Sequence, residues 1–341
     1  MDGGLVTATA REIESNADWL PHRIDPVARR VEFLRIPPSA YGEPGFLADF
    51  RPAAADGVAS LAFEEVAALD PVTGPLHFVF HTAFCRSTLL ARALNIEGVS
   101  IGLAEPGIIA SLANFMGSGG QEGAELTRAV LRLLARRRAG GEAVFVKPTN
   151  HANRLIPLLL DAAPSSRAIL MTNGLEPFLG SIARRGLMGR RWGRSLFLEL
   201  QAYAPVDFGL DRREMFLATD MQVAGMAWVM GQNHFASLLS GPQGGRLAVL
   251  DGDRFNAERA RTLGAVLGFA GLAAPPEAIA AAADGPAFAT HAKLGQAFSG
   301  PQDTAHASKR DGTDEIGQVA HWVSLIAAQM GPGVPLAQTL F

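Results

Sequence analysis

The sequence has one cysteine, Cys85, in 341 residues, and only two tyrosines. A single cysteine excludes an intrachain disulfide, so we expect a reducing, cytoplasmic environment. It also leaves the scattered histidines without the spacing of a zinc site, and we expect no metal. No segment approaches the roughly 20 consecutive apolar residues that a membrane helix needs. The N-terminal "MDGGLVTATAREIESNADW" does not begin like a signal peptide, because it lacks a basic start followed by an apolar core.

An excess of charge of either sign is also missing. Lys and Arg total 30 against 33 Asp and Glu, so the formal net charge is −3. A nearly neutral chain gives no general reason to expect binding to nucleic acid or to an anionic membrane. Any anion site must therefore be local. Apolar residues make up 48% of the chain, enough for a sizeable core, and the abundance of Ala, Gly and Arg fits a bacterial source with GC-rich genes.

Short, unbroken apolar runs begin at residue 76. Such runs are typical of strands that are covered on both faces of a sheet. We interpret these runs as strands: Leu76–Phe80, Val99–Leu103, Val144–Lys147, Arg167–Met171 and Leu247–Leu250. Stretches with the character of helices lie between and after them: Thr88–Asn95, Pro106–Phe115, Ala124–Arg137, Asn150–Ala162, Leu175–Arg185, Arg213–Leu239 and Ala273–Ala283.

This alternation predicts an α/β fold with a central, mainly parallel sheet flanked by helices. Residues 1–70 mix polar, helix-like stretches with Pro and Gly, and we expect an N-terminal extension packed on a main domain of residues 71–341. In parallel sheets, ligands bind beyond the carboxyl ends of the strands. The polar residues that follow each strand are therefore the candidates for a site.

The segment "HTAFCRST" (81–88) follows the first of these strands and opens a helix. Backbone N–H groups at such a turn attract phosphate or sulfate. Arg86 adds a cation, and Ser87 and Thr88 add hydroxyl groups. The segment lacks the Gly and Lys of the common phosphate loop. An ordinary turn, with Ser or Thr as a helix cap, is the alternative. Cys85 does not complete a phosphatase C-x5-R loop, because residue 91 is Ala.

Several segments in order resemble the sulfotransferases, which use 3′-phosphoadenylyl sulfate (PAPS) and have a three-layer fold similar to that of P-loop NTPases. "FVFHTAFCRSTLLARAL" resembles the family's 5′-phosphosulfate loop, and "LAEPGII" resembles a Glu-Pro segment of many bacterial members. "AILMTNGLEPFLGSIARRG" is similar to the family's strand with its Arg-x-Pro and later Ser, and "LAVLDGDRFNAERARTLGAVLGFAGL" to its Glu-Asp-Leu segment and Phe-Leu-Gly ending. The resemblance covers about residues 76–272.

The resemblance implies that PAPS is the donor and that the loop and two later residues bind it. These residues are Thr82, Ala83, Phe84, Cys85, Arg86, Ser87, Thr88, Asn173 and Ser181. Two positions differ from the family pattern. Phe84 stands near the position of the family's loop cation, and Asn173 stands where the family has the Arg of its 3′-phosphate site.

Three residues are candidates for catalysis. Lys147 ends a strand and would stabilise the charge that develops on the leaving phosphate. His151, in "KPTNH", and His81, at the mouth of the loop, are candidate bases for the acceptor. In the alternative interpretation, His151 is an exposed residue at the start of a helix after a capping Asn150, and His81 is a partly buried residue bonded to backbone.

Two further groups have open interpretations. The arginines of "ARRGLMGRRWGR" (183–194) form either an anion site or the solvated end of a helix. Lys309 and Arg310 belong either to a lid or to a surface loop. The sequence thus predicts a sulfotransferase-like enzyme that acts on a small-molecule or glycan acceptor. The alternatives are a nucleotide-dependent kinase that uses Mg²⁺ and Asp251, and a non-catalytic relative that binds an anion.

Overall fold

The computed structural model describes residues 7–41, 45–116, 120–138, 142–288, 314–329, 334 and 336–341. The segment with Lys309 and Arg310 lies outside these residues. Within the described ranges, no helix is long and apolar enough to cross a membrane.

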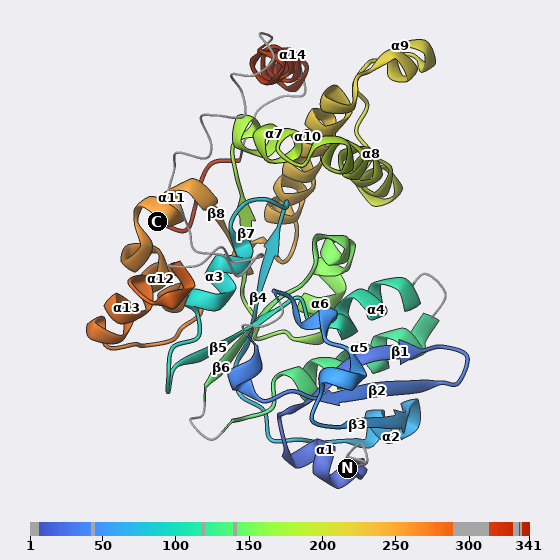
Figure 1. The fold of residues 1–341 in the computed structure, drawn as a ribbon, viewed down its shortest axis with the longest axis vertical. Coiled ribbons are helices and arrows are strands. Elements are labelled where there is room, and N and C mark those ends of the chain that lie inside the picture. The colour runs from blue at the N-terminus through green and yellow to red at the C-terminus, as the bar shows by residue number, and fades with distance from the viewer. Residues whose placement is uncertain are drawn as a thin grey trace. The chain divides into compact units, whose positions relative to one another are not determined.

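The central sheet has five parallel strands in the order β5-β6-β4-β7-β8, flanked by helices (Figure 1). The strands are β4 (Leu76–His81), β5 (Ser100–Ala104), β6 (Ala143–Lys147), β7 (Ala168–Thr172) and β8 (Leu247–Asp251). Each predicted strand is confirmed to within one residue at either end. The apolar runs were a reliable signal because all residues of β4, β6 and β7 are buried.

Most predicted helices are also confirmed. The corresponding elements are α3 (Ser87–Ala93), α4 (Gly107–Phe115), α5 (Gly120–Leu134), η4 (Asn150–Leu155), α6 (Ile156–Ala162), α7 (Leu175–Ala183) and α13 (Pro276–Ala283). Helices α11 (Gly252–Ala257) and α12 (Arg259–Phe269) follow β8. Short 3-10 turns complete these segments: η1 (Pro38–Ala40), η2 (Leu47–Asp49), η3 (Pro52–Ala54), η5 (Gly244–Arg246) and η6 (Pro286–Phe288).

The region between residues 186 and 240 differs from the prediction. The expected helix Arg213–Leu239 is two helices, α9 (Arg212–Leu217) and α10 (Asp220–Ser240), because Thr219 forms a capping box with Gln222. Helix α8 (Gly186–Tyr203), which contains three glycines, was not predicted from the sequence. Glycine weakens a helix in isolation, but here it allows close packing. A Cβ at Gly193 would lie 2.9 Å from Cβ of Ala224 in α10.

The N-terminal residues form a three-stranded antiparallel sheet that the sequence analysis did not predict. Its strands are β1 (Trp19–Asp25), β2 (Arg30–Arg35) and β3 (Val58–Ala62), accompanied by α1 (Ala10–Ser15) and α2 (Phe63–Ala68). A register shift between Pro21 and Arg23 breaks the alternation that would have revealed β1. These strands belong to a compact unit of residues 1–80, 87–169 and 258–297.

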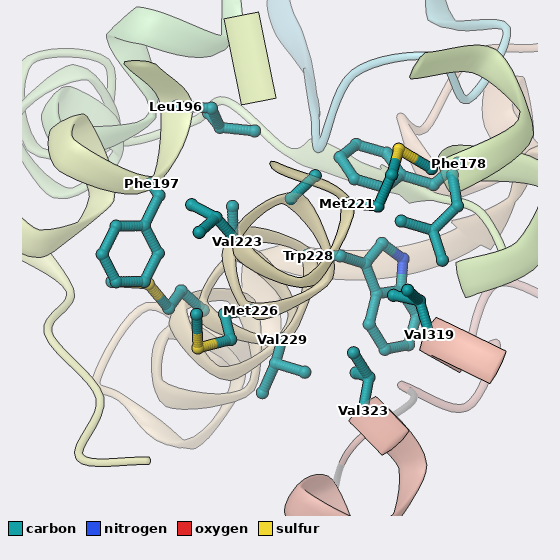
Figure 2. Packing of buried hydrophobic residues seen from close by; sticks show 14 of the residues in the cluster. Phe178, Leu196, Phe197, Met221, Val223, Met226, Trp228, Val229, Val319 and Val323 are labelled. Atoms are coloured by element: carbon teal, nitrogen blue, oxygen red, sulfur yellow. The ribbon is translucent and has the colours of Figure 1, made fainter. Parts of the chain in front are cut away.

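A second compact unit contains residues 81–86, 170–257 and 298–341. Its core surrounds α10, against which α7, α8 and α14 (Glu315–Gln329) pack. Figure 2 shows Trp228 of α10 lying among Val319, Val323 and Phe178. Trp228 is 4% exposed, and its Nε1 donates to the backbone oxygen of Asn173 at 2.9 Å. The core of this unit is thereby connected to the end of β7.

Candidate functional site

The loop Thr82–Arg86 connects β4 to α3 and contains three residues with left-handed backbone. The φ angle is 74° at Ala83, 54° at Phe84 and 66° at Arg86. Without glycine, this conformation costs about 1–2 kcal/mol at each residue. Such strain persists only where neighbouring groups hold the backbone, and it concentrates at functional sites. Ala83 and Phe84 are consecutive, whereas Phe84 and Arg86 flank Cys85, which is not left-handed. An alternation of this second kind turns successive N–H groups toward one point in anion-binding nests.

The first half of the loop is held by the strand ends. The N–H of Thr82 donates to the Met171 oxygen at 3.1 Å, which continues the pairing with β7. The N–H of Ala83 donates to Nδ1 of His81 at 3.1 Å. The neutral His81 ring therefore carries its proton on Nε2. His81 is thus buried and bonded to backbone, while its role as a base stays a prediction.

Phe84 is held through both its ring and its carbonyl group. Its ring centroid lies 4.8 Å from that of Trp192 and 5.9 Å from that of Phe178. The guanidinium carbon of Arg185 lies 4.2 Å from the ring centroid. Nδ2 of Asn173 donates to the Phe84 oxygen at 3.3 Å. The Phe84 side chain thus packs against α7 and α8 and anchors the loop.

The second half of the loop rests on α11. A Cβ at Gly252 would lie 2.3 Å from the Cys85 oxygen, so only glycine allows this approach. The Cys85 side chain is buried. Nη2 of Arg86 lies 3.2 Å from Oδ1 of Asp253, and both side chains are partly exposed.

Asp251 supports this same helix. Its Oδ1 accepts from the N–H groups of Asp253 and Arg254, both at 2.9 Å. This arrangement is a helix cap.

Helix α3 begins directly after the loop, at Ser87 and Thr88. Both side chains are buried. A Cβ at Gly102 of β5 would lie 1.7 Å from the Ala91 oxygen, so α3 packs closely on that strand. The strand–loop–helix order predicted for "HTAFCRST" is therefore present, whereas its role in anion binding stays a prediction.

Ser181 lies in α7 and is hydrogen-bonded to the guanidinium group of Arg184. Its hydroxyl donates to the Pro177 oxygen and accepts from Nη2 of Arg184, each at 2.9 Å. Arg185 donates to the Ser181 oxygen at 2.7 Å. Partial burial lowers the pKa of Arg185, and the charge of Arg184 lowers it further. A bound anion would offset this repulsion between neighbouring cations.

Two other arginines of the basic stretch form ion pairs between helices. Arg190 pairs with Glu315 of α14 at 2.6 Å, and Arg194 pairs with Asp220 of α10. These two arginines connect helices within the unit. Only part of "ARRGLMGRRWGR" is therefore available for a ligand.

A separate polar group in the first unit joins Lys147 and Glu105. The Lys147 side chain is 1% exposed, and its Nζ donates to Oε1 of Glu105, which is 18% exposed. Nζ also lies 5.1 Å from the ring centroid of Phe46. Lys147 is thus a buried residue, not a surface lysine.

The backbone of Glu105 is as constrained as its side chain. Its φ angle is +51°, its N–H donates to the Lys147 oxygen at 2.7 Å, and its own oxygen accepts from Ala48 at 2.9 Å. No role for Glu105 was predicted from the sequence, although its location after β5 and its Glu-Pro context were available signals. His151, by contrast, is exposed in η4, with Thr149 and not Asn150 as the cap residue.

No protein-family model matches this chain, and no curated protein matches it. Among solved structures, it matches the sulfotransferase domain from the curacin biosynthetic pathway, with 12% identity, a TM-score of 0.41 and coverage of 75% of this chain and 99% of that domain. It also matches the sulfotransferase domain from the Synechococcus PCC 7002 olefin synthase, with 12% identity, a TM-score of 0.39 and coverage of 75% and 97%. The chain is similar in α/β fold to these sulfotransferase domains, the family that its sequence motifs resemble.

Proposed function

We propose that this protein is a PAPS-dependent sulfotransferase that transfers a sulfuryl group to a hydroxyl or amine of an acceptor. The observation that carries the proposal is the loop Thr82–Arg86, in which three residues without glycine have left-handed φ angles. An ordinary turn has no need of such a conformation or of contacts at every residue. A cradle of N–H groups after the first strand of a parallel sheet is a suitable binding site for a phosphosulfate.

Residues of the second unit fit the anionic groups of the donor. Thr82 has a buried Oγ1 with no hydrogen-bond partner among the described residues, and it adds a donor at the loop. Ser181 with Arg184 supplies a hydroxyl and a cation for the 3′-phosphate. Arg184 would then provide the charge that is missing at Asn173, because guanidinium groups bind phosphate strongly.

Glu105 and Lys147 supply the acid–base chemistry in this proposal. PAPS supplies the sulfuryl group, and adenosine 3′,5′-bisphosphate and the acceptor proton are released. The partly exposed Glu105 carboxylate takes that proton, and Lys147 holds the carboxylate in one orientation. His151 is the alternative base because it is exposed.

A thermal-shift measurement distinguishes the three candidate functions. Adenosine 3′,5′-bisphosphate should raise the Tm of a sulfotransferase more than ATP with Mg²⁺ does, since ligands stabilise the state that binds them. A larger shift with ATP and Mg²⁺ would support the kinase. A shift with inorganic sulfate but with neither nucleotide would support the non-catalytic anion binder.

Two arginine variants localise the effect. Arg184→Ala should reduce the shift with the bisphosphate and leave the shift with adenosine 5′-phosphate unchanged. Arg191→Ala changes an exposed arginine of α8 and serves as the control. Equal responses of the two variants to the bisphosphate would remove Arg184 from the proposed site.

A further inference from the structure

Asn173 lies between β7 and α7 and has contacts on two sides. Its side-chain Nδ2 donates to the Phe84 oxygen at 3.3 Å, and its backbone oxygen accepts from Nε1 of Trp228 at 2.9 Å. Asn173 is 4% exposed and Trp228 is also 4% exposed. A buried helix, a strand end and the loop are therefore connected through one residue.

The left-handed backbone of Phe84 needs contacts that hold it in place. This residue has a φ angle of 54° and no glycine to lower the cost of that angle. Its ring packs against Phe178 and Trp192, which fixes the side chain. The hydrogen bond from Asn173 fixes the carbonyl group and so sets the orientation of the peptide that carries the N–H of Cys85.

The other polar atom of the Asn173 side chain, Oδ1, is unfavourable for contact with an anion. Oδ1 is buried and has no hydrogen-bond partner among the described residues. A carbonyl oxygen can only accept, so it repels the oxygens of a phosphate. The donor group of the side chain, Nδ2, is directed at the Phe84 oxygen.

We propose that Asn173 is a positioning residue: it holds the Phe84 peptide in its left-handed conformation and does not bind the 3′-phosphate, although it stands at the position of the family's phosphate-binding Arg. Trp228 acts with it by fixing the end of β7. This inference rests on the proposed function for the identity of the nucleotide, but not for the role of Asn173 in the loop. The cation for the 3′-phosphate is Arg184, and the loop is held by an uncharged amide.

Two readouts test this role. The first is hydrogen exchange of the backbone N–H groups of Cys85–Thr88. Asn173→Ala removes the hydrogen bond to the Phe84 oxygen and should increase the exchange rate of these N–H groups about tenfold, the effect of losing one net hydrogen bond. The second is the affinity for adenosine 5′-phosphate and for adenosine 3′,5′-bisphosphate. Because both need the loop, both should bind about tenfold more weakly, and the ratio of their dissociation constants should stay unchanged.

Two further variants provide matched controls. Trp228→Phe keeps an aromatic ring in the core but removes Nε1, and it should increase loop exchange in the same direction as Asn173→Ala. Ser181→Ala should leave loop exchange unchanged and weaken only the bisphosphate. Far-UV circular dichroism checks that each variant is folded, and Trp228→Phe decides the question if Asn173→Ala does not fold.

Three outcomes would overturn the inference. One is unchanged exchange of Cys85–Thr88 in a folded Asn173→Ala or Trp228→Phe variant. The second is a loss of affinity confined to the bisphosphate. The third is tighter bisphosphate binding by Asn173→Arg, which would mean that this position faces the phosphate. If wild-type protein binds neither nucleotide, the proposed function fails, and the exchange measurement still decides the role of Asn173.

Discussion

Lys147 donates a hydrogen bond to Glu105 from a side chain that is 1% exposed, whereas the Glu105 side chain is 18% exposed. The ammonium group is therefore enclosed, and the carboxylate is the member of the pair that meets solvent. The pair is also joined through the backbone, since the N–H of Glu105 donates to the Lys147 oxygen at 2.7 Å. This asymmetry suggests different roles for the two side chains, and it can be tested.

Glu105→Gln removes a base but preserves shape. We expect kcat to fall by about a hundredfold or more, with little change in affinity for adenosine 3′,5′-bisphosphate, because proton transfer contributes about 10²–10⁴ to the rate. Steady-state kinetics with PAPS and an accepted hydroxyl or amine compound measures this. Glu97→Gln, at an exposed position, is the control. Full activity of Glu105→Gln would leave His151 as the base to be tested.

Lys147→Ala should lower kcat by roughly a hundredfold or more while nucleotide affinity changes little, because the enclosed Lys147 orients the Glu105 carboxylate that takes the acceptor proton. Arg86→Ala should do the reverse, since Arg86 is a partly exposed cation of the loop. Its expected effect is weaker nucleotide binding at an unchanged kcat. Measuring kcat and the dissociation constant of both variants checks the contrast. Wild-type activity of Lys147→Ala would mean that the buried pair is purely structural.

Gly252→Ala should disturb the loop Thr82–Arg86 at Cys85. The added Cβ would lie 2.3 Å from the Cys85 oxygen, and a backbone atom cannot move aside cheaply. We expect a loss of about 1–3 kcal/mol in the free energy of unfolding, together with weaker anion binding. Gly268→Ala is the matched control, because a Cβ there meets nothing within 4 Å in helix α12. That variant should be as stable as wild type or slightly more stable. Denaturant titration of both proteins makes the comparison.

Arg136 should be essential for stability in the first unit. Its buried guanidinium donates to the oxygens of Leu133 and Asn16, both at 2.8 Å, and to those of Ile13 and Trp19. Arg136→Met would remove these four hydrogen bonds from a buried site, at a cost of about 3–5 kcal/mol. Arg137→Met changes the exposed neighbour and should cost little. Equal denaturation midpoints for the two variants would contradict the assigned role.

His77 should make the protein less stable in mild acid. Burial lowers the pKa of His77 to about 4, and the charge of Arg167 contributes. The unfolded chain titrates near pH 6.5, so between about pH 6.5 and pH 4 only the unfolded state binds this proton. The free energy of unfolding should therefore fall by about 1.4 kcal/mol per pH unit in that window, about 3 kcal/mol in all.

His77→Gln is the variant that checks this dependence. It cannot take up the proton, so its stability should vary less between pH 6.5 and pH 4. Some slope should remain, because burial also lowers the pKa of His22. Urea titrations of the two proteins across this range measure the difference. Identical slopes would show that His77 takes up its proton in the folded state.

Local sequence patterns were sufficient to predict an element when all of its residues have the same environment. The strands of the parallel sheet are buried on both faces, so unbroken apolar runs identified all five. Helix α8 was not predicted, because its Gly193 is favourable only where Ala224 of α10 packs closely against it. The antiparallel sheet β1-β2-β3, in which a bulge and long-range pairing replace a regular local pattern, was not predicted either.

By itself, the sequence determined the α/β class, the strands and the loop that follows β4, because burial and backbone geometry leave periodic patterns along the chain. Only the tertiary structure decided which atoms meet. Phe84 turned out to anchor the loop through Phe178, Trp192 and Asn173, and Lys147 proved to be buried against Glu105. Residues separated by 89 positions in one case and 42 in the other form these contacts. No local pattern encodes such partners, because they are set by how distant segments pack together.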